Sequence, residues 1–157
     1  MAEVLTGSNS YVTTEEAAAY FADRLHADAW TSASADDQGK ALVTAAVLLD
    51  RHIVWQGAKA SPDQGMEWPR LDIPGIASTT TPQAVKVAQM ELALVLLAKD
   101  TTALPDTAGM KSIQADTIKI EVAPDDRVKV IPDQVFALVA PYGFRSGGLR
   151  SISLRRV

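Results

Sequence analysis

Cysteine is absent from this 157-residue sequence, and only two histidines are present. Without thiols the chain has no disulfide scaffold, no thiolate metal site and no cysteine nucleophile. His26 and His52 each lack a second ligand at the i+3 or i+4 spacing of helical metal sites, so we expect ordinary surface or boundary residues. Aromatic residues make up only 6% of the chain, which predicts a core of small and aliphatic side chains.

Motifs of catalysis and phosphate binding are missing too. No Gly-x-Ser-x-Gly elbow presents a serine nucleophile, and residues 143–148 lack the Gly-Lys-Ser/Thr ending of a P-loop. Two acid pairs, at 36–37 and 125–126, sit where a helix start and a turn already explain them. We therefore expect no enzymatic activity, no cofactor and no metal site.

Charge is unevenly distributed along the chain, although its total is only −4. Residues 1–37 hold seven acids and one base, whereas residues 141–157 hold four arginines and no acid. The two ends are complementary, either within one subunit or between neighbours, and scattered solvated charge is an equally simple interpretation. The negative total disfavours a protein that coats nucleic acid.

Signals for export or membrane insertion are not found. The first ten residues lack the basic and apolar regions of a signal peptide. The most apolar stretch, residues 84–98, is shorter than the roughly 20 residues that cross a bilayer, and it contains three polar side chains. We expect a soluble protein made in the cytoplasm, with no membrane partner.

Capping signals mark two N-terminal helices. Thr13 and Glu16 fit a capping box before an amphipathic helix of about three turns, in which Leu25 falls on the buried face. Ser34 fits the N-cap of a second helix that runs to about Ile53. Acidic residues in the first turn of the second helix are stabilised by the positive N-terminal end of its dipole.

A third helix is expected to begin with Thr81 as its cap and Pro82 in its first turn. Only three of residues 84–98 are polar, so this helix must be central in the core or buried on two sides. Because so small a bundle rarely surrounds one helix, we expect a subunit interface to supply the second cover. The side chains expected there are Val87, Met90, Leu94 and Leu97.

Between these helices, residues 55–81 contain six prolines and glycines, which exclude a long regular element. The segment is too apolar for disorder. We therefore expect an ordered excursion that includes a short ribbon. Its structural anchors are expected to be Trp55, Trp68 and Arg70.

The C-terminal part changes to strand periodicity. Alternation on both sides of Pro124 predicts a β-hairpin over residues 117–131, followed by a short helix from Pro132 to about Ala140. Residues 149–157 alternate again after a Gly-Gly hinge. They predict either a strand added to another chain or an edge strand against the hairpin.

These elements together predict a mainly α protein, a small helical bundle with a long tryptophan-containing excursion, a β-hairpin and an extended C-terminal tail. The helical body is expected to span residues 1–143 and the extended tail residues 144–157. The tail residues expected to make contacts are Leu149, Arg150, Ile152, Leu154, Arg155 and Arg156.

Several short motifs occur in a characteristic order. They are Ser10-Tyr11-Val12-Thr13, Leu49-Asp50, Trp55-x-Gly57, Pro62-Asp63-Gln64, Trp68-Pro69-Arg70, Thr81-Pro82-Gln83-Ala84-Val85-Lys86 and Glu91-Leu92-Ala93. In this combination, over roughly residues 10–100, the chain resembles the neck proteins of tailed bacteriophages. These are variously labelled head–tail connector, adaptor, or DnaT-like single-stranded-DNA-binding protein. The helix near residues 131–142 and the basic tail match more loosely.

The resemblance implies a virion protein of the head–tail neck, assembled as a dodecameric ring beneath the portal. Its partners would be the portal protein, other copies of itself, and the next neck, stopper or tail protein. Double-stranded DNA would pass through the ring without specific binding. The C-terminal segment would dock on the portal.

Single-stranded-DNA binding is the alternative function. It would place four arginines on the DNA backbone and use Trp or Tyr as stacking platforms. The net charge weighs against it, and only Tyr142 and Phe144 lie near these arginines in the sequence. The arginines concerned are Arg145, Arg150, Arg155 and Arg156.

Overall fold

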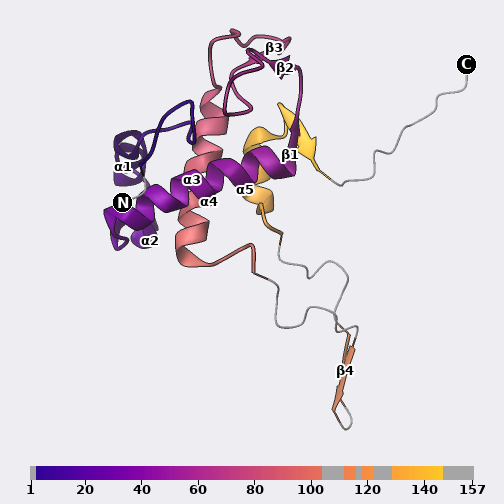
Figure 1. Ribbon diagram of the computed structural model, residues 1–157. Helices are drawn as coiled ribbons and strands as arrows, with labels where there is room; N and C mark the ends of the chain where they lie inside the picture. Colours follow the sequence, from indigo (N-terminus) through magenta and orange to yellow (C-terminus); the bar gives the residue numbers. More distant parts are fainter. Residues whose placement is uncertain (1–2, 104–111, 116–117, 122–128, 147–157) are drawn as a thin grey trace, which may run out of the picture.

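A computed structural model describes residues 3–103, 112–115, 118–121 and 129–146 (Figure 1). This part of the chain is mainly helical, as predicted, with small two-stranded sheets. The helices are α1 (Thr14–Ala22), α2 (Asp28–Thr31), α3 (Ala35–His52), α4 (Gln83–Ala98) and α5 (Asp133–Val139). The strands are β1 (Ile53–Trp55), β2 (Ala58–Lys59), β3 (Arg70–Leu71), β4 (Ser112–Ala115), β5 (Ile118–Glu121) and β6 (Gly143–Arg145).

Both predicted N-terminal caps are present. Oγ1 of Thr13 accepts a hydrogen bond from N of Glu16 at 3.1 Å, and Oε2 of Glu16 accepts one from N of Thr13 at 2.9 Å. The Ser34 hydroxyl accepts from N of Asp37 at 3.1 Å and caps α3. The expected burial of Leu25 is wrong, because α1 ends three residues before it and its side chain is 81% exposed.

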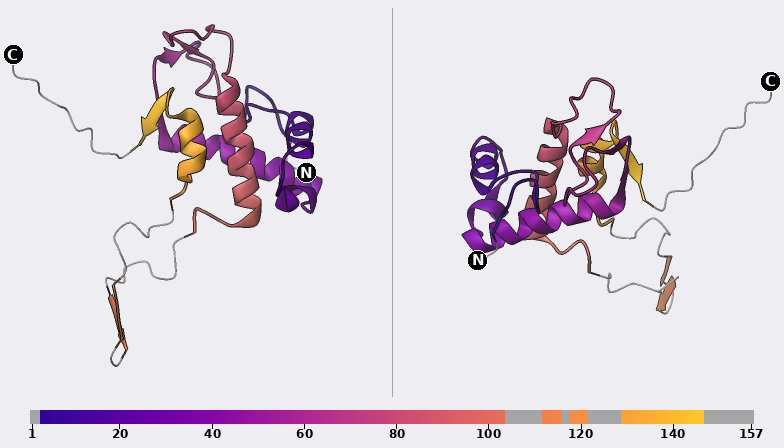
Figure 2. Two further views of the ribbon diagram at one scale, coloured as in Figure 1. Left: turned by 180° about the vertical axis from the view of Figure 1, so that it is seen from behind. Right: turned by 45° about the horizontal axis from the view of Figure 1, so that its top comes forward.

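α3 and α4 cross at the centre of the helical body, and α5 lies beside α4 (Figure 2). α1 and α2 lie at the start of α3, whereas β1 and β6 lie at its far end. The short α2 was not expected from the sequence. It places Trp30 in the core against Phe21, with ring centroids 4.6 Å apart.

The start of α4 differs from the predicted cap. Pro82, not Thr81, is the N-cap residue, and no side chain caps this helix. Pro82 has an extended backbone, with ψ of 142°, and its carbonyl accepts hydrogen bonds from N of Val85 at 3.0 Å and N of Lys86 at 3.3 Å. The helix therefore begins one residue later than expected.

The chain itself covers α4, which packs against α2, α3 and α5. Met90 and Leu94 are 3% and 8% exposed, so neither side chain is available at the surface of this body. Val87 and Leu97 are half-buried and pack against the same core. Two of the four side chains expected at a subunit interface are therefore covered within the chain, and the interface stays a prediction for Val87 and Leu97.

The segment after α3 is an ordered excursion with a short ribbon, in which β2 pairs antiparallel with β3. Trp55 and Trp68 are buried and meet edge-to-face, with ring centroids 5.7 Å apart. Tyr142, from the chain after α5, meets Trp68 edge-to-face at 5.8 Å. The aromatic cluster thus joins the excursion to the C-terminal part of the body.

β1 and β6 form a second ribbon at the far end of α3, with Val54 opposite Phe144. Ile53 and Trp55 are buried, whereas Val54 lies on the outer face. Glycine is required at position 143, because a Cβ there would lie 2.7 Å from Cγ2 of Ile53 and 2.9 Å from O of Val54. The first two residues of the predicted tail, 144 and 145, thus pair within the body.

The hairpin predicted over residues 117–131 is wrong in its second strand. β5 lies where its first strand was expected, but it pairs with β4 rather than with residues 128–130. Lys129 and Val130 are not in a strand, and the turn expected around Pro124 lies outside the described residues. Residues 112–115 alternate polar and apolar side chains as well, so periodicity alone could not select the partner.

α4 and α5 pack together, and the chain that joins them leaves and returns at one place. The hydroxyl of the buried Thr101 donates a hydrogen bond to O of Val130 at 2.9 Å. This bond closes the base of the intervening segment, residues 102–129.

The remaining expectations for the tail fall on residues 147–157, which lie outside the described part of the chain. They concern Leu149, Arg150, Ile152, Leu154, Arg155 and Arg156. No helix within the described ranges is both long enough and apolar enough to cross a bilayer.

Candidate functional site

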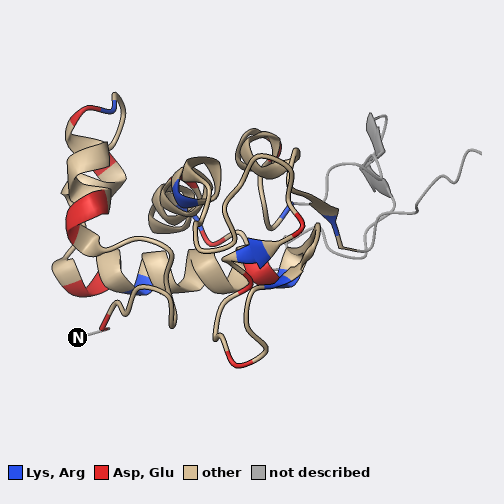
Figure 3. Ribbon diagram, turned by 90° about the horizontal axis from the view of Figure 1, so that it is seen from above, with Lys and Arg blue, Asp and Glu red and all other residues tan. Residues whose placement is uncertain are grey.

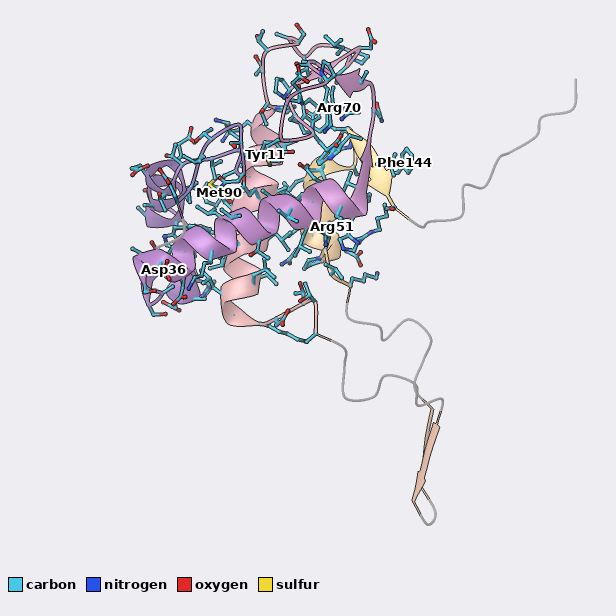
Figure 4. All side chains as sticks on the ribbon, viewed as in Figure 1. Tyr11, Asp36, Arg51, Arg70, Met90 and Phe144 are labelled. Atoms are coloured by element: carbon cyan, nitrogen blue, oxygen red, sulfur yellow. The ribbon has the colours of Figure 1, made fainter. Side chains whose placement is uncertain are left out.

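Arg70 lies at the base of the excursion, where its guanidinium is buried (Figure 4). Nε donates to O of Gln56 at 2.7 Å, and Nη2 donates to O of Gly57 at 2.9 Å. Nη1 donates to both O and Oε2 of Glu67, at 3.0 and 2.6 Å. The forked donor set of arginine therefore ties the start of the excursion to its return.

Asp50, near the end of α3, connects the excursion to the N-terminal segment. Oδ1 accepts a hydrogen bond from the Tyr11 hydroxyl, and Oδ2 accepts one from N of Glu67 at 3.1 Å. Burial raises the pKa of Asp50 above its usual range, against the opposing effect of these two donors. Burial and the neighbouring carboxylate also raise the pKa of Tyr11.

Gln89 provides a second polar link, in the middle of α4, and its side chain is fully buried. Its Oε1 accepts from N of Tyr11 at 2.9 Å. Its Nε2 donates to Oγ of Ser10 at 2.7 Å and to O of Leu42 at 2.9 Å. The amide thus holds the N-terminal segment against both central helices.

These polar groups serve the architecture. The Asp50, Gln89 and Arg70 side chains are occupied by hydrogen bonds to neighbouring segments. Among the described residues, no group of three or more His, Asp or Glu side chains is arranged to hold a metal ion. The sequence marked Asp50 and Ser10 only as motif members and Gln89 only as a polar interruption. The signal that could have identified Gln89 as a buried polar link is its position on an otherwise apolar helix.

The structure describes nine Lys and Arg side chains, and seven of them form ion pairs. For example, Arg24 makes a bidentate pair with Glu91, at 2.6 and 2.8 Å. No described carboxylate lies within 4.0 Å of the other two, Arg51 and Lys99. The paired cations are Arg24, Lys40, Lys59, Arg70, Lys86, Lys129 and Arg145.

All nine aromatic residues lie in the described part of the chain, and none has an exposed side chain. Five are buried and four are half-buried. The half-buried residues are Tyr20, Phe136, Tyr142 and Phe144. Single-stranded bases stack on open aromatic faces, and only these four rings are partly accessible for such contacts.

Arg145 is the one predicted DNA-contacting arginine that the structure describes. Its Nη2 pairs with Oδ1 of Asp133 at 2.7 Å, and its Nη1 donates to O of Ile131 at 2.9 Å. The guanidinium carbon lies 4.4 Å from the ring centroid of Phe136. The structure does not bring Arg145 together with an exposed aromatic ring.

The end of the body around α1 and α2 is mainly acidic, whereas the other end carries charges of both signs (Figure 3). Carboxylates gather around α1, α2 and the start of α3, where Glu15, Asp23 and Asp28 are exposed. Arg51 lies in the last turn of α3, beside the β1–β6 ribbon. The two ends of the body therefore differ in charge as well as in structure.

A comparison with solved structures finds none that matches this chain. A comparison with family models gives a match over residues 2–157 to the family described as "Putative DnaT-like ssDNA binding protein". The match covers nearly the whole chain, including all of the described body. The chain therefore belongs to this DnaT-like family.

Proposed function

We propose that the chain is a non-enzymatic virion protein, a head–tail connector subunit that forms a ring between the portal and the next neck or tail protein. The residues that carry its resemblance to bacteriophage neck proteins support this proposal through their positions. Trp55, Trp68 and Arg70 build the excursion, and Tyr11 and Asp50 attach it to the body. The shared motifs are thus those of a shared architecture, not of a reaction.

The chemistry of the surface carries this proposal. Every aromatic ring of the described body is buried or half-buried, and seven of its nine described cations are already paired with acids. Such a surface offers few open aromatic faces to bases and few free cations to phosphates. It suits a channel subunit past which double-stranded DNA moves without adhering.

Single-stranded-DNA binding is the second candidate, and the description of the family favours it directly. The basic residues available for it are in the C-terminal segment, which contains Arg150, Arg155 and Arg156. In this function the segment would follow the phosphate backbone, and the paired Arg145 would contribute little. A half-buried ring such as Tyr142 would have to become exposed to stack on a base.

A parallel binding experiment separates the two functions. The full chain is titrated with immobilised portal rings and with a fluorescent single-stranded oligonucleotide at two salt concentrations. The connector proposal expects saturable portal binding and only weak oligonucleotide binding. Tight oligonucleotide binding that falls steeply with salt, without portal binding, would establish the second function and overturn the first.

A truncated variant tests whether the C-terminal segment binds the portal. A variant that ends at Gly148 lacks Leu149–Val157 and keeps every described contact of the body. We expect it to unfold at the temperature of the full chain but to lose portal binding. A variant with Arg150, Arg155 and Arg156 changed to Gln tests whether charge alone supplies the attachment.

A further inference from the structure

Two apolar side chains and a cation are exposed near the end of α3 that leads into β1. Val47 on α3 is 42% exposed, and Val54 on β1 is 43% exposed. Arg51 lies between them in the sequence, is exposed, and has no described carboxylate within 4.0 Å. Positions 47 and 51 are one helical turn apart and share the solvent side of α3. We call these three residues the ribbon-end surface.

The opposite end of α3 carries a surface of complementary composition. Leu25, in the link between α1 and α2, is 81% exposed, the highest value among the large apolar side chains of the described part. Asp23 and Asp28 flank it and are exposed, and no described Lys or Arg lies within 4.0 Å of either carboxylate. We call these three residues the acidic-end surface.

The two surfaces cannot meet within one body. α3 has 18 residues, so its ends are separated by about 27 Å at 1.5 Å per residue. Figures 1 and 3 place α1 and α2 at one end of this helix and the β1–β6 ribbon at the other. Each surface nevertheless offers what the other lacks, an apolar contact and a charge of opposite sign. The occupant that fits both is a second copy of this chain.

We propose that copies associate head to tail, with the ribbon-end surface of one copy on the acidic-end surface of the next. Val47 and Val54 pack against Leu25 of the second copy, and Arg51 lies between the carboxylates of its Asp23 and Asp28. Such a contact is heterologous and repeats from copy to copy, so it closes into a ring when the rotation between copies allows. This inference rests on the proposed ring and names the surfaces that build it.

Disulfide cross-linking can test this contact. The natural chain has no cysteine, so only the introduced thiols can form disulfides. The double variant Leu25→Cys/Val54→Cys is oxidised at high protein concentration and run on a denaturing gel. We expect a ladder of dimers, trimers and larger species. The control Leu25→Cys/Ala98→Cys, with its second thiol at an exposed position outside both surfaces, should remain largely monomeric.

Single variants distinguish this arrangement from a two-fold dimer. Leu25→Cys alone and Val54→Cys alone should give no efficient dimer, because the partner surface then lacks a thiol. Efficient dimerisation of either single variant would show a two-fold contact and overturn the proposal. A double variant that forms no ladder beyond the control would overturn it as well.

Charge exchange provides an independent measurement. Arg51→Glu should weaken association in sedimentation velocity by roughly tenfold, and adding Asp23→Lys and Asp28→Lys should restore most of it. Lys99→Glu is the matched control, since Lys99 is also exposed without a described acid partner. An equal loss in both single variants would mean that total charge, not this contact, controls association.

The cross-linking and binding experiments together test the contact and the proposed function independently. Portal binding by a chain that gives no ladder would reject these surfaces and leave the connector role standing. A ladder from a chain that binds oligonucleotide and not portal would keep the contact and reject the connector role.

Discussion

The hydroxyl of Tyr11 donates a hydrogen bond to Oδ1 of Asp50, 39 residues further along the chain. The second oxygen of the same carboxylate accepts from the backbone of Glu67. One side chain at the end of α3 therefore holds both the N-terminal segment and the excursion. Because the site is buried, its hydrogen bonds stabilise the fold only while every member is present.

Changing Tyr11 to Phe tests this link. The substitution removes one donor from a buried carboxylate and should lower the free energy of unfolding by about 1–3 kcal/mol. Urea denaturation measures the loss. Tyr142→Phe is a matched control, since no described group is recorded as a partner of its hydroxyl, and we expect a change below about 0.5 kcal/mol. Equal losses would mean that the bond to Asp50 adds nothing beyond the general effect of removing a tyrosine hydroxyl.

Arg70 should not tolerate replacement by lysine. A lysine ammonium cannot reproduce the fork that reaches Gln56, Gly57 and Glu67, so these carbonyls would lose the donors that join the two parts of the excursion. We expect Arg70→Lys to cost about 2–4 kcal/mol in urea denaturation and to speed proteolysis within residues 56–81.

Lys59 supplies the control for Arg70. It pairs with the same Glu67 carboxylate, at 3.1 Å, but is half-buried rather than buried. Lys59→Met should therefore cost less than about 1 kcal/mol. A Lys59 variant as damaging as Arg70→Lys would contradict the assignment of the main role to the arginine.

Gln89→Leu should destabilise the body although it makes α4 more apolar. The amide is the acceptor for N of Tyr11, and leucine would leave that group buried without a partner and remove the bond to O of Leu42. We expect a loss of about 2–4 kcal/mol in thermal or urea unfolding. Gln83→Leu, at an exposed position on the same helix, should be nearly neutral. A neutral Gln89→Leu variant would show that this network does not stabilise the fold.

Glu91 gives stability a defined dependence on pH. Burial acts to raise its pKa, but the hydrogen bonds from Arg24 and Tyr20 outweigh this effect and the net shift is downward. Its contribution is therefore present above the unfolded-state pKa of about 4.3 and is lost as pH falls through the lower folded-state pKa.

The variant Glu91→Gln measures that contribution. Near neutral pH it should be less stable than the natural chain by about 1 kcal/mol, since the pair is only partly buried. The difference should shrink towards zero as pH falls through the folded-state pKa. Urea denaturation at several pH values gives both curves. A difference that grows on acidification would show that the ionised carboxylate is not the stabilising form.

Local signals in the sequence predicted the parts of the fold that depend on near neighbours. The Thr13 capping box and the Ser34 cap involve residues three apart, and both are present. The ordered excursion was predictable because residues 55–81 combine breakers with apolar side chains that must be buried.

Features that depend on the tertiary arrangement were not predictable. The burial of Met90 and Leu94 within one chain required knowing that α2, α3 and α5 surround α4. The sequence predicted a strand at 118–121. Residues 112–115 and 128–130 both alternate polar and apolar side chains, so this pattern does not show which of them pairs with that strand. The links of Gln89 to Tyr11 and of Asp50 to Glu67 span parts of the chain that no local pattern relates.

The bond between Thr101 and the carbonyl of Val130 has a consequence for the tolerance of the fold to insertions. Because α4 and α5 meet at the point where the chain departs and returns, the body does not depend on how long the path between them is. Doubling or halving such a loop changes its closure free energy by only about 0.6 kcal/mol. A change in the length of residues 102–129 should therefore leave the packing of α4 against α5 nearly unaltered.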